Sequence, residues 1–165
     1  MLDPKRISVI TESEAQTEQV GQRVAQILAP GSVISLCGTL GAGKTRLVKG
    51  IATGLHANAD AVVSPTFSIV NHYLGDFRIN HLDVYRVADT DEFDELGGDE
   101  LFESDAITVV EWGDRFPASL PESYLQIEIE ILSDTRRRLV FRLVGDFPAT
   151  LEDRLRETLA PFNPC

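Results

Sequence analysis

The sequence is poor in cysteine and methionine and contains no long apolar run. Its 165 residues include two cysteines, one methionine and one tryptophan. Cys37 and Cys165 have neither the spacing of metal ligands nor the pattern of a disulfide framework. No stretch of about 18 apolar residues is present, and the first residues lack the apolar segment of a signal peptide. We therefore expect a cytoplasmic protein that does not contact membranes.

Positive charge is also scarce. Lysine and arginine number 15 against 26 aspartates and glutamates, so the formal net charge is −11. Proteins that bind nucleic acid directly usually carry a basic surface that displaces counterions from phosphates. The only dense basic patch is the arginine triplet 136–138, and such a triplet between two strands is typical of a solvated turn. We expect any RNA to be held by a partner.

Residues 38–45, GTLGAGKT, match the phosphate-binding loop G-x-x-x-x-G-K-[ST]. In this loop, backbone N–H groups surround a phosphate, which needs the space that a Cβ would take. Lys44 is expected to reach the terminal phosphates, and the Thr45 hydroxyl to bind the magnesium ion that accompanies a nucleotide. The predicted nucleotide-binding positions are Gly38, Gly41, Ala42, Gly43, Lys44 and Thr45.

A glycine-rich turn that matches by accident is the alternative, and the flanking segments argue against it. Residues 32–37 form a short apolar run after a Pro-Gly turn, which predicts a strand. From Lys44 to about residue 55, apolar residues recur at helical spacing. Strand, loop and helix in this order are the context that the motif requires.

The whole pattern predicts a single domain, residues 1–165, with a loose tail at 161–165. Strands at 7–10, 32–37, 67–70 and 79–84 are expected in the first half, the first two each followed by a helix, and a buried strand is expected at 107–110. Segments 125–131 and 138–144 alternate apolar residues with acidic and basic ones respectively, which predicts an antiparallel hairpin. We expect the α/β class, in the three-layer fold of P-loop NTPases, with a mainly parallel sheet and an antiparallel edge hairpin.

Two acidic residues end predicted strands. Glu111 follows the apolar run 107–110, and Asp83 ends the segment 79–83. Ligands of parallel sheets bind at the carboxyl ends of strands, where P-loop enzymes place an acidic residue on the magnesium ion. We favour Glu111 on the metal and Asp83 beside it or orienting the attacking water, and the reverse assignment stays open. Both join Lys44 as catalytic candidates and Thr45 as candidate metal ligands.

Thr66 and Trp112 each allow more than one interpretation. Thr66 lies in the segment 64–67, SPTF, between the phosphate loop and the next acidic strand. Nucleotide switches order such a segment through the γ-phosphate and its magnesium, so Thr66 is either a catalytic γ-phosphate sensor or a turn residue stiffened by Pro65. Trp112 follows Glu111 and covers the site, docks a partner or packs in the core.

Four segments together resemble the bacterial TsaE (YjeE) family: GTLGAGKT, SPTF, HLDVYR and VEWGDR. That family is the ATPase needed to make the threonylcarbamoyladenosine beside the tRNA anticodon. The resemblance covers roughly residues 7–145. The phosphate loop alone occurs in many families, whereas the four segments in this order are specific. Arg46 departs from the family, where a second threonine often follows the position of Thr45, but no phosphate or metal ligand is lost.

The resemblance implies ATP hydrolysis that is weak in isolation, with ATP and Mg²⁺ as cofactors. It implies as partners the TsaD and TsaB proteins, with tRNA reached only through them. It also implies site roles for six residues: Thr45 and Glu111 at the magnesium, Asp83 in turnover, Thr66 in a switch-like loop, and Thr11 and Arg136 near the nucleotide.

Three other functions use a phosphate loop. A small-molecule kinase would take the arginines 136–138 as lid residues, but the chain has no segment that reads as an acceptor-binding insert. A small GTPase needs an N-K-x-D motif, which this sequence lacks. A nucleotide-gated binding module, in which hydrolysis is incidental, stays open.

Overall fold

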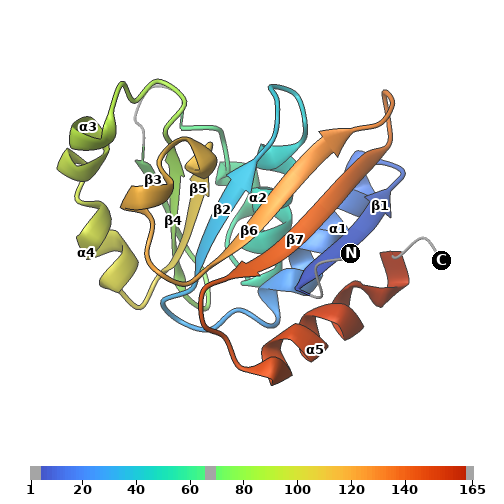
Figure 1. Ribbon diagram of the computed structural model, residues 1–165. Helices are drawn as coiled ribbons and strands as arrows, with labels where there is room; N and C mark the ends of the chain where they lie inside the picture. Colours follow the sequence, from blue (N-terminus) through green and yellow to red (C-terminus); the bar gives the residue numbers. More distant parts are fainter. Residues whose placement is uncertain (1–4, 66–69, 163–165) are drawn as a thin grey trace.

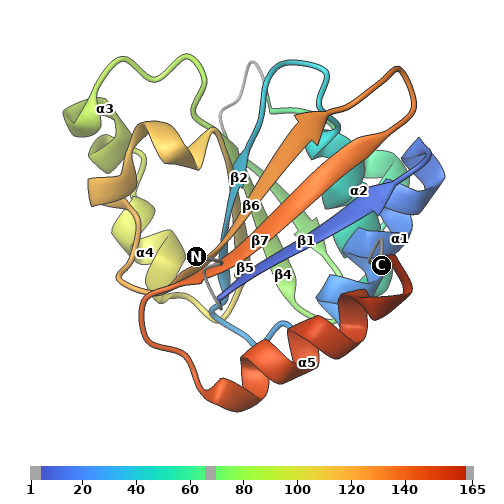
Figure 2. The same cartoon turned by 45° about the vertical axis from the view of Figure 1, so that its right-hand side comes forward.

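A seven-stranded sheet organises the chain, with the strand order β1-β7-β6-β2-β5-β4-β3. The computed structural model describes residues 5–65 and 70–162. The strands are β1 Arg6–Thr11, β2 Val33–Cys37, β3 Val70–Leu74, β4 Arg78–Asp83, β5 Ile107–Glu111, β6 Tyr124–Ile131 and β7 Arg137–Val144. The helices are α1 Glu14–Ala25, α2 Lys44–Gly54, α3 Thr90–Glu95, α4 Gly98–Glu103 and α5 Ala149–Leu159. Helices lie on both sides of this sheet (Figures 1 and 2).

The middle of the sheet is parallel. β2 pairs with β5 and with β6, and β5 pairs with β4, all in parallel. Every residue of β2 and of β5 is buried. Strands covered on both faces read as continuous apolar runs, which is why the sequence pattern located these two. The carboxyl ends of β2, β5 and β4 therefore meet at one edge of the sheet.

Antiparallel hairpins flank the parallel strands. The predicted hairpin of β6 and β7 is confirmed, and its outward charges pair across the strands, with Arg138 Nη1 2.7 Å from Glu130 Oε2. β1 adds antiparallel to β7 and so forms the outer edge beyond that hairpin. At the other edge, β3 pairs antiparallel with β4. The strand predicted at 67–70 lies outside the described residues except for Val70, where β3 begins, and its pairing with β4 in a hairpin was not predicted.

Two packed helices, α1 and α2, cover one face. α1 begins after Ser13, whose side chain accepts a hydrogen bond from the Gln16 N–H and so caps the helix. α2 approaches α1 so closely that a Cβ on Gly50 would lie 2.1 Å from the Glu18 carbonyl oxygen. α5 packs on the same face through Leu155 and Leu159. None of the described helices combines the length and apolarity needed to cross a membrane.

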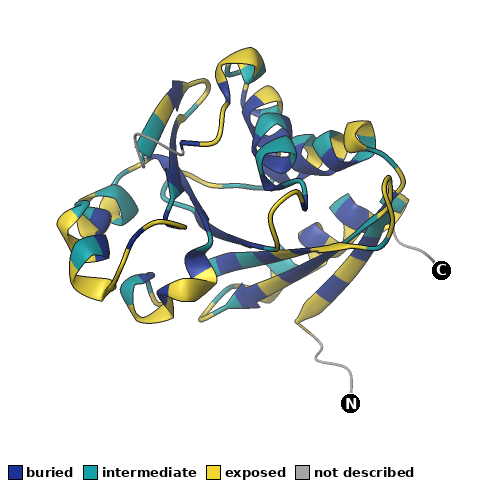
Figure 3. Cartoon of the chain, turned by 90° about the horizontal axis from the view of Figure 1, so that it is seen from above, coloured by how far each residue is buried: buried dark blue, intermediate teal, exposed yellow. Residues whose placement is uncertain are grey.

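A smaller layer covers the opposite face. Phe93 of α3 and Phe116 pack there against Leu82, Val84 and Val110. Neighbouring β5 residues divide between the two cores, since Val109 faces α1 and α2 while Val110 faces this layer. Seen from above in Figure 3, buried positions line the sheet and exposed ones lie on the outer faces of the helices. The three layers of an α/β fold are therefore present.

Candidate nucleotide-binding site

The loop 38–45 joins β2 to α2 in a conformation that requires glycine. Gly38, Gly41 and Gly43 have φ angles of 146°, 79° and 107°. A Cβ on Gly38 would also lie 2.7 Å from the carbonyl oxygen of Ile129. Gly43 is the N-cap of α2, so no side chain caps this helix, and its first turn has no acidic residue. The first N–H groups of α2 thus suit an anion, because nothing on their own helix neutralises them.

Lys44 is held at the mouth of this loop. Its side chain is buried, and Nζ donates to the carbonyl oxygens of Gly38, at 2.7 Å, and Thr39, at 3.1 Å. The same ammonium lies 4.1 Å from the centroid of the Trp112 ring. Burial lowers the pKa of Lys44, and the charges of Glu111 and Asp83 oppose this. A partly desolvated cation is a strong partner for a phosphate.

A pocket of about 270 Å³ opens beside the loop. Its walls come from the loop, from the first turn of α1, and from the carboxyl ends of β4 and β5. Seven of the predicted site residues line it: Gly41, Ala42, Gly43, Lys44, Thr45, Asp83 and Glu111. Gly38 stands at the entry of the loop, and the candidate sensor Thr66 lies outside the described residues. Trp112 lines the pocket too, as one of its predicted interpretations required.

The two carboxylates stand side by side. Asp83 and Glu111 are register partners in the parallel pair of β4 and β5, so both side chains leave the sheet on the same face. Glu111 is 2% exposed. Asp83 is half-buried, and its Oδ1 and Oδ2 accept hydrogen bonds from the Tyr85 N–H, at 2.9 Å, and the Ser64 hydroxyl, at 3.1 Å.

The donor set fits a magnesium ion that arrives with a phosphate. In the described part of the chain, no three or more His, Cys, Asp and Glu side chains gather into a metal centre. Magnesium characteristically takes one or two protein carboxylates and keeps water and phosphate oxygens as its remaining ligands. The Thr45 hydroxyl and the carboxylates of Asp83 and Glu111, all in one pocket, match that requirement.

His81 was given no role from the sequence, yet it is the partner of Glu111. It is fully buried, and its Nε2 lies 2.9 Å from Glu111 Oε2. The spacing held a signal, because alternation along a strand puts His81 on the same face of β4 as Asp83.

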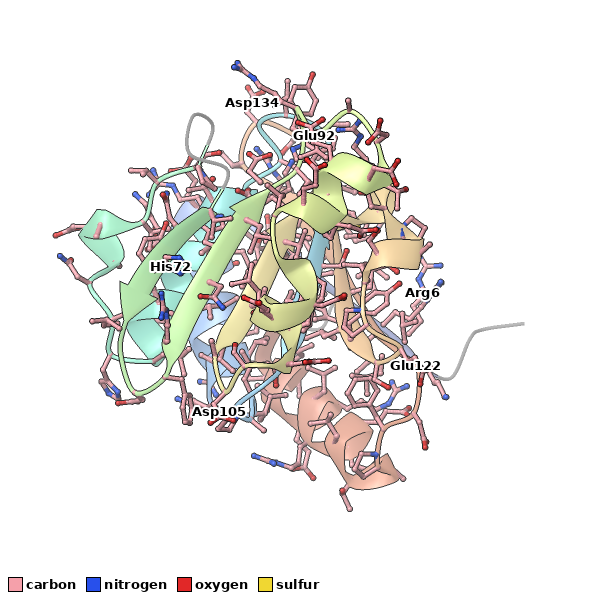
Figure 4. The ribbon with its side chains drawn as sticks, turned by 90° about the vertical axis from the view of Figure 1, so that its left-hand side faces the viewer. Arg6, His72, Glu92, Asp105, Glu122 and Asp134 are labelled. Atoms are coloured by element: carbon pink, nitrogen blue, oxygen red, sulfur yellow. The ribbon has the colours of Figure 1, made fainter. Side chains whose placement is uncertain are left out.

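An arginine of the hairpin does contact the phosphate loop, but it is Arg137. Its Nε donates to the Ala42 carbonyl, at 2.9 Å, and Nη2 to the Gly41 carbonyl, at 3.3 Å. Asp134, in the turn before Arg137, lies at the opposite end of the sheet from Asp105 (Figure 4). The predicted Arg136 instead pairs with Glu12 at 3.0 Å. Its place near a nucleotide stays a prediction.

Thr11 is deeply buried at the end of β1. Its hydroxyl lies 2.9 Å from that of Thr17. Thr17 in turn lines a small cavity of about 40 Å³ between the phosphate loop and the hairpin turn, together with Arg137 and Asp134. A role for Thr11 beside a nucleotide would thus act through Thr17, and it also stays a prediction.

Comparisons with known proteins agree with this geometry. The family model described as "Threonylcarbamoyl adenosine biosynthesis protein TsaE" matches residues 11–139. The chain belongs to the TsaE family. The TsaE protein of Treponema pallidum is 37% identical over 79% of this chain and 96% of its own length. The TsaE protein of Bacillus subtilis is 38% identical over 86% of this chain and 89% of its own. Both are named as tRNA threonylcarbamoyladenosine biosynthesis proteins.

A solved structure confirms the fold. The crystal structure of Bacillus subtilis YdiB superimposes with a TM-score of 0.76 and 32% sequence identity. The match covers 93% of this chain and 95% of YdiB. The predicted P-loop NTPase fold of the α/β class is therefore correct, as is the resemblance to TsaE.

Proposed function

We propose that this TsaE-family chain is a magnesium-dependent ATPase that hydrolyses ATP to ADP and phosphate, weakly when alone. It would serve formation of the threonylcarbamoyl group on the tRNA adenosine beside the anticodon, through the TsaD and TsaB proteins. One observation carries the proposal. A single pocket brings Lys44, Thr45, Asp83 and Glu111 together at an uncapped helix N-terminus.

Each side chain has a defined task in this reaction. Bound ATP and its magnesium ion would supply the γ-phosphoryl group and the charge that polarises it. Lys44 donates to two loop carbonyls in this structure, and with ATP bound it would bind the terminal phosphate oxygens as a point charge. Thr45 and Glu111 hold the metal, and Asp83 orients water or shares the metal. The loop N–H groups would neutralise charge on the phosphates, because hydrogen-bond donors that are held in place need no reorganisation during the reaction.

The surface around the pocket supports a protein partner. Among the described residues, Leu40, Val63, Leu74, Tyr85 and Ile131 are the large apolar side chains with the greatest exposure. Leu40 is 68% exposed and lines the pocket, while Tyr85 is 46% exposed and packs against Trp112 with ring centroids 4.9 Å apart. The charge of −11 opposes direct binding of tRNA. Apolar side chains beside a nucleotide site and an acidic surface favour action through TsaD and TsaB.

Calorimetric titration with ATP and Mg²⁺ tests the site. Lys44→Ala should weaken ATP binding by at least about 100-fold, because a charge-assisted contact worth about 3 kcal/mol is lost. Lys49→Ala removes the same charge from the same helix outside the pocket lining, and should bind like wild type. Equal affinities for all three proteins would refute the phosphate loop as the site.

Product analysis tests the chemistry. Glu111→Gln should fold and lose magnesium-dependent release of free phosphate, whereas a kinase would yield a phosphorylated product instead.

Adding TsaD and TsaB should raise ATP turnover. Turnover that does not respond to these partners would favour a nucleotide-gated binding module.

A further inference from the structure

A buried chain of hydrogen bonds leads away from Glu111. His81 Nε2 lies 2.9 Å from Glu111 Oε2, and His81 Nδ1 lies 3.0 Å from the Tyr73 hydroxyl. That hydroxyl also lies 3.2 Å from the carbonyl oxygen of Val63, so its single hydrogen lies between Nδ1 and this carbonyl. The exposed fractions of Glu111, His81 and Tyr73 are 2%, 0% and 7%. Three buried residues from three strands thus connect the site to Val63, a loop residue at the surface.

The sheet register builds this path. His81 is two residues before Asp83, the register partner of Glu111, so His81 reaches Glu111 diagonally across β4 and β5. Asn71 is the register partner of His81 in β3, so Tyr73 is its diagonal neighbour on the other side. The rings of Tyr73 and His81 have centroids 5.9 Å apart. A hairpin of β3 with β4 is therefore needed to complete the path.

The hydrogen bonds indicate which nitrogen of the His81 imidazole carries a hydrogen. An ionised carboxylate only accepts, so the nitrogen that faces Glu111 must carry a hydrogen. His81 therefore donates from Nε2 to Oε2, and in the neutral ring Nδ1 accepts from the Tyr73 hydroxyl. Such a donor holds the carboxylate in one rotamer and directs its remaining lone pairs into the pocket. A leucine at position 81 would fill the space without this effect, and a buried polar chain is costly unless its members are satisfied.

The second carboxylate is held from the same segment. Ser64, the residue after Val63, donates its hydroxyl to Asp83 Oδ2 at 3.1 Å. We propose that the segment Val63–Ser64 positions both site carboxylates, Asp83 directly through Ser64 and Glu111 through Tyr73 and His81. His81 and Tyr73 are positioning residues. This inference rests on the proposed function, since it assigns the carboxylates to the magnesium ion.

The first test determines the tautomer of His81, and this measurement needs no nucleotide. Nitrogen-15 spectra of the imidazoles in the wild-type protein should show a protonated Nε2 for His81, assigned by its loss in His81→Gln. Tyr73→Phe should shift the His81 signals and leave those of His72, which lies on the same hairpin (Figure 4), unchanged. A bare Nε2 on His81 would overturn the proposal, whether or not the protein hydrolyses ATP.

Magnesium dependence is the second test. His81→Leu should raise the Mg²⁺ concentration for half-maximal turnover and lower kcat, together by about 10- to 100-fold, the usual effect of losing a partner of a metal ligand. His81→Gln keeps an N–H near Oε2 and should recover most of this loss. Metal-free ATP binding should stay within about twofold in both variants, because the phosphate loop is unchanged. His72→Leu is the matched control, because the Nδ1 of His72 contacts Asn80 Oδ1 and not a site carboxylate.

If His81→Leu does not fold, Tyr73→Phe still tests the proposal. It should lower magnesium-dependent turnover in the wild-type background and have little further effect in His81→Gln, because both changes act on Glu111 through the same hydrogen-bond chain. Equal losses in both backgrounds, or loss of turnover with an unchanged magnesium requirement, would show a purely structural role. An inactive wild type with a protonated Nε2 would contradict the proposed function and leave the hydrogen-bond chain established.

Discussion

Replacement of Arg137 is the sharpest test of how the phosphate loop is held. Its guanidinium donates to the carbonyls of Ala42 and Gly41, and Nη1 also donates to those of Ser133, at 2.7 Å, and Arg136, at 3.0 Å. One side chain thereby ties the turn of the hairpin to the loop, more than 90 residues away in sequence. Arg137→Ala should leave the loop carbonyls to water and let the loop sample conformations that bind phosphate poorly.

The magnitude follows from the contacts. A hydrogen bond from a charged donor contributes about 1.5–3 kcal/mol, and of the two bonds to the loop only the one to Ala42, at 2.9 Å, has good length. Water replaces part of what is lost, because Arg137 is half-buried. We therefore expect a total loss of about 1.5–3 kcal/mol, which weakens ATP binding by about 10- to 150-fold. Arg137→Lys should recover only part, since an ammonium cannot reproduce the planar fork.

Calorimetric titration with ATP and Mg²⁺ measures this loss, and hydrogen exchange of the loop amides without nucleotide should show faster exchange in Arg137→Ala. Arg138→Ala is the matched control. The Arg138 side chain is 41% exposed and pairs with Glu130, which is 53% exposed. Such surface pairs contribute about 0–1 kcal/mol. Indistinguishable affinities for Arg137→Ala and Arg138→Ala would refute the tethering argument.

Three further outcomes are expected. Gly50→Ala should lower the free energy of unfolding by about 1–3 kcal/mol in urea titrations, because its Cβ meets the Glu18 carbonyl, whereas the exposed Thr53→Ala on the same helix should change it by less than about 0.5 kcal/mol. Burial, with the charge of Asp114, raises the pKa of Cys37 from 9.0 to about 11, so the native state keeps its proton longer than the unfolded state. The contribution of Cys37 to stability should then fall as pH rises from 9.0 to about 11, and the stability of Cys37→Ala should fall less steeply over this range. In gel-shift assays tRNA alone should form no complex, and tight binding would contradict the role of partners.

Local patterns predicted the elements whose signals lie within one segment. In the loop 38–45, glycine, lysine and threonine each have a defined role in binding phosphate or metal, and they stand in consecutive positions. The loop can therefore be identified without any tertiary information. β2 and β5 were found because both faces are covered, which leaves unbroken apolar runs. The hairpin of β6 and β7 was found because charge of opposite sign alternates along its two strands.

Signals that depend on pairing were missed. Three consecutive arginines are equivalent in sequence, and only the register of β7 against β1 and β6 decides that Arg137 faces the loop while Arg138 faces Glu130. The hairpin of β3 and β4 has a short, partly exposed first strand with a weak apolar pattern. Without that hairpin, His81 has no visible connection to Tyr73 or Val63.

The sequence alone therefore determined the phosphate loop, the acidic residues at the ends of two buried strands, and membership of a recognisable family. Only the tertiary structure decided what holds these parts: Arg137 on the loop, Ser64 on Asp83, and His81 on Glu111. The reason is geometric. A binding motif consists of residues that are close in the sequence, whereas the groups that orient it come from distant segments. The register of the sheet determines which of their side chains meet.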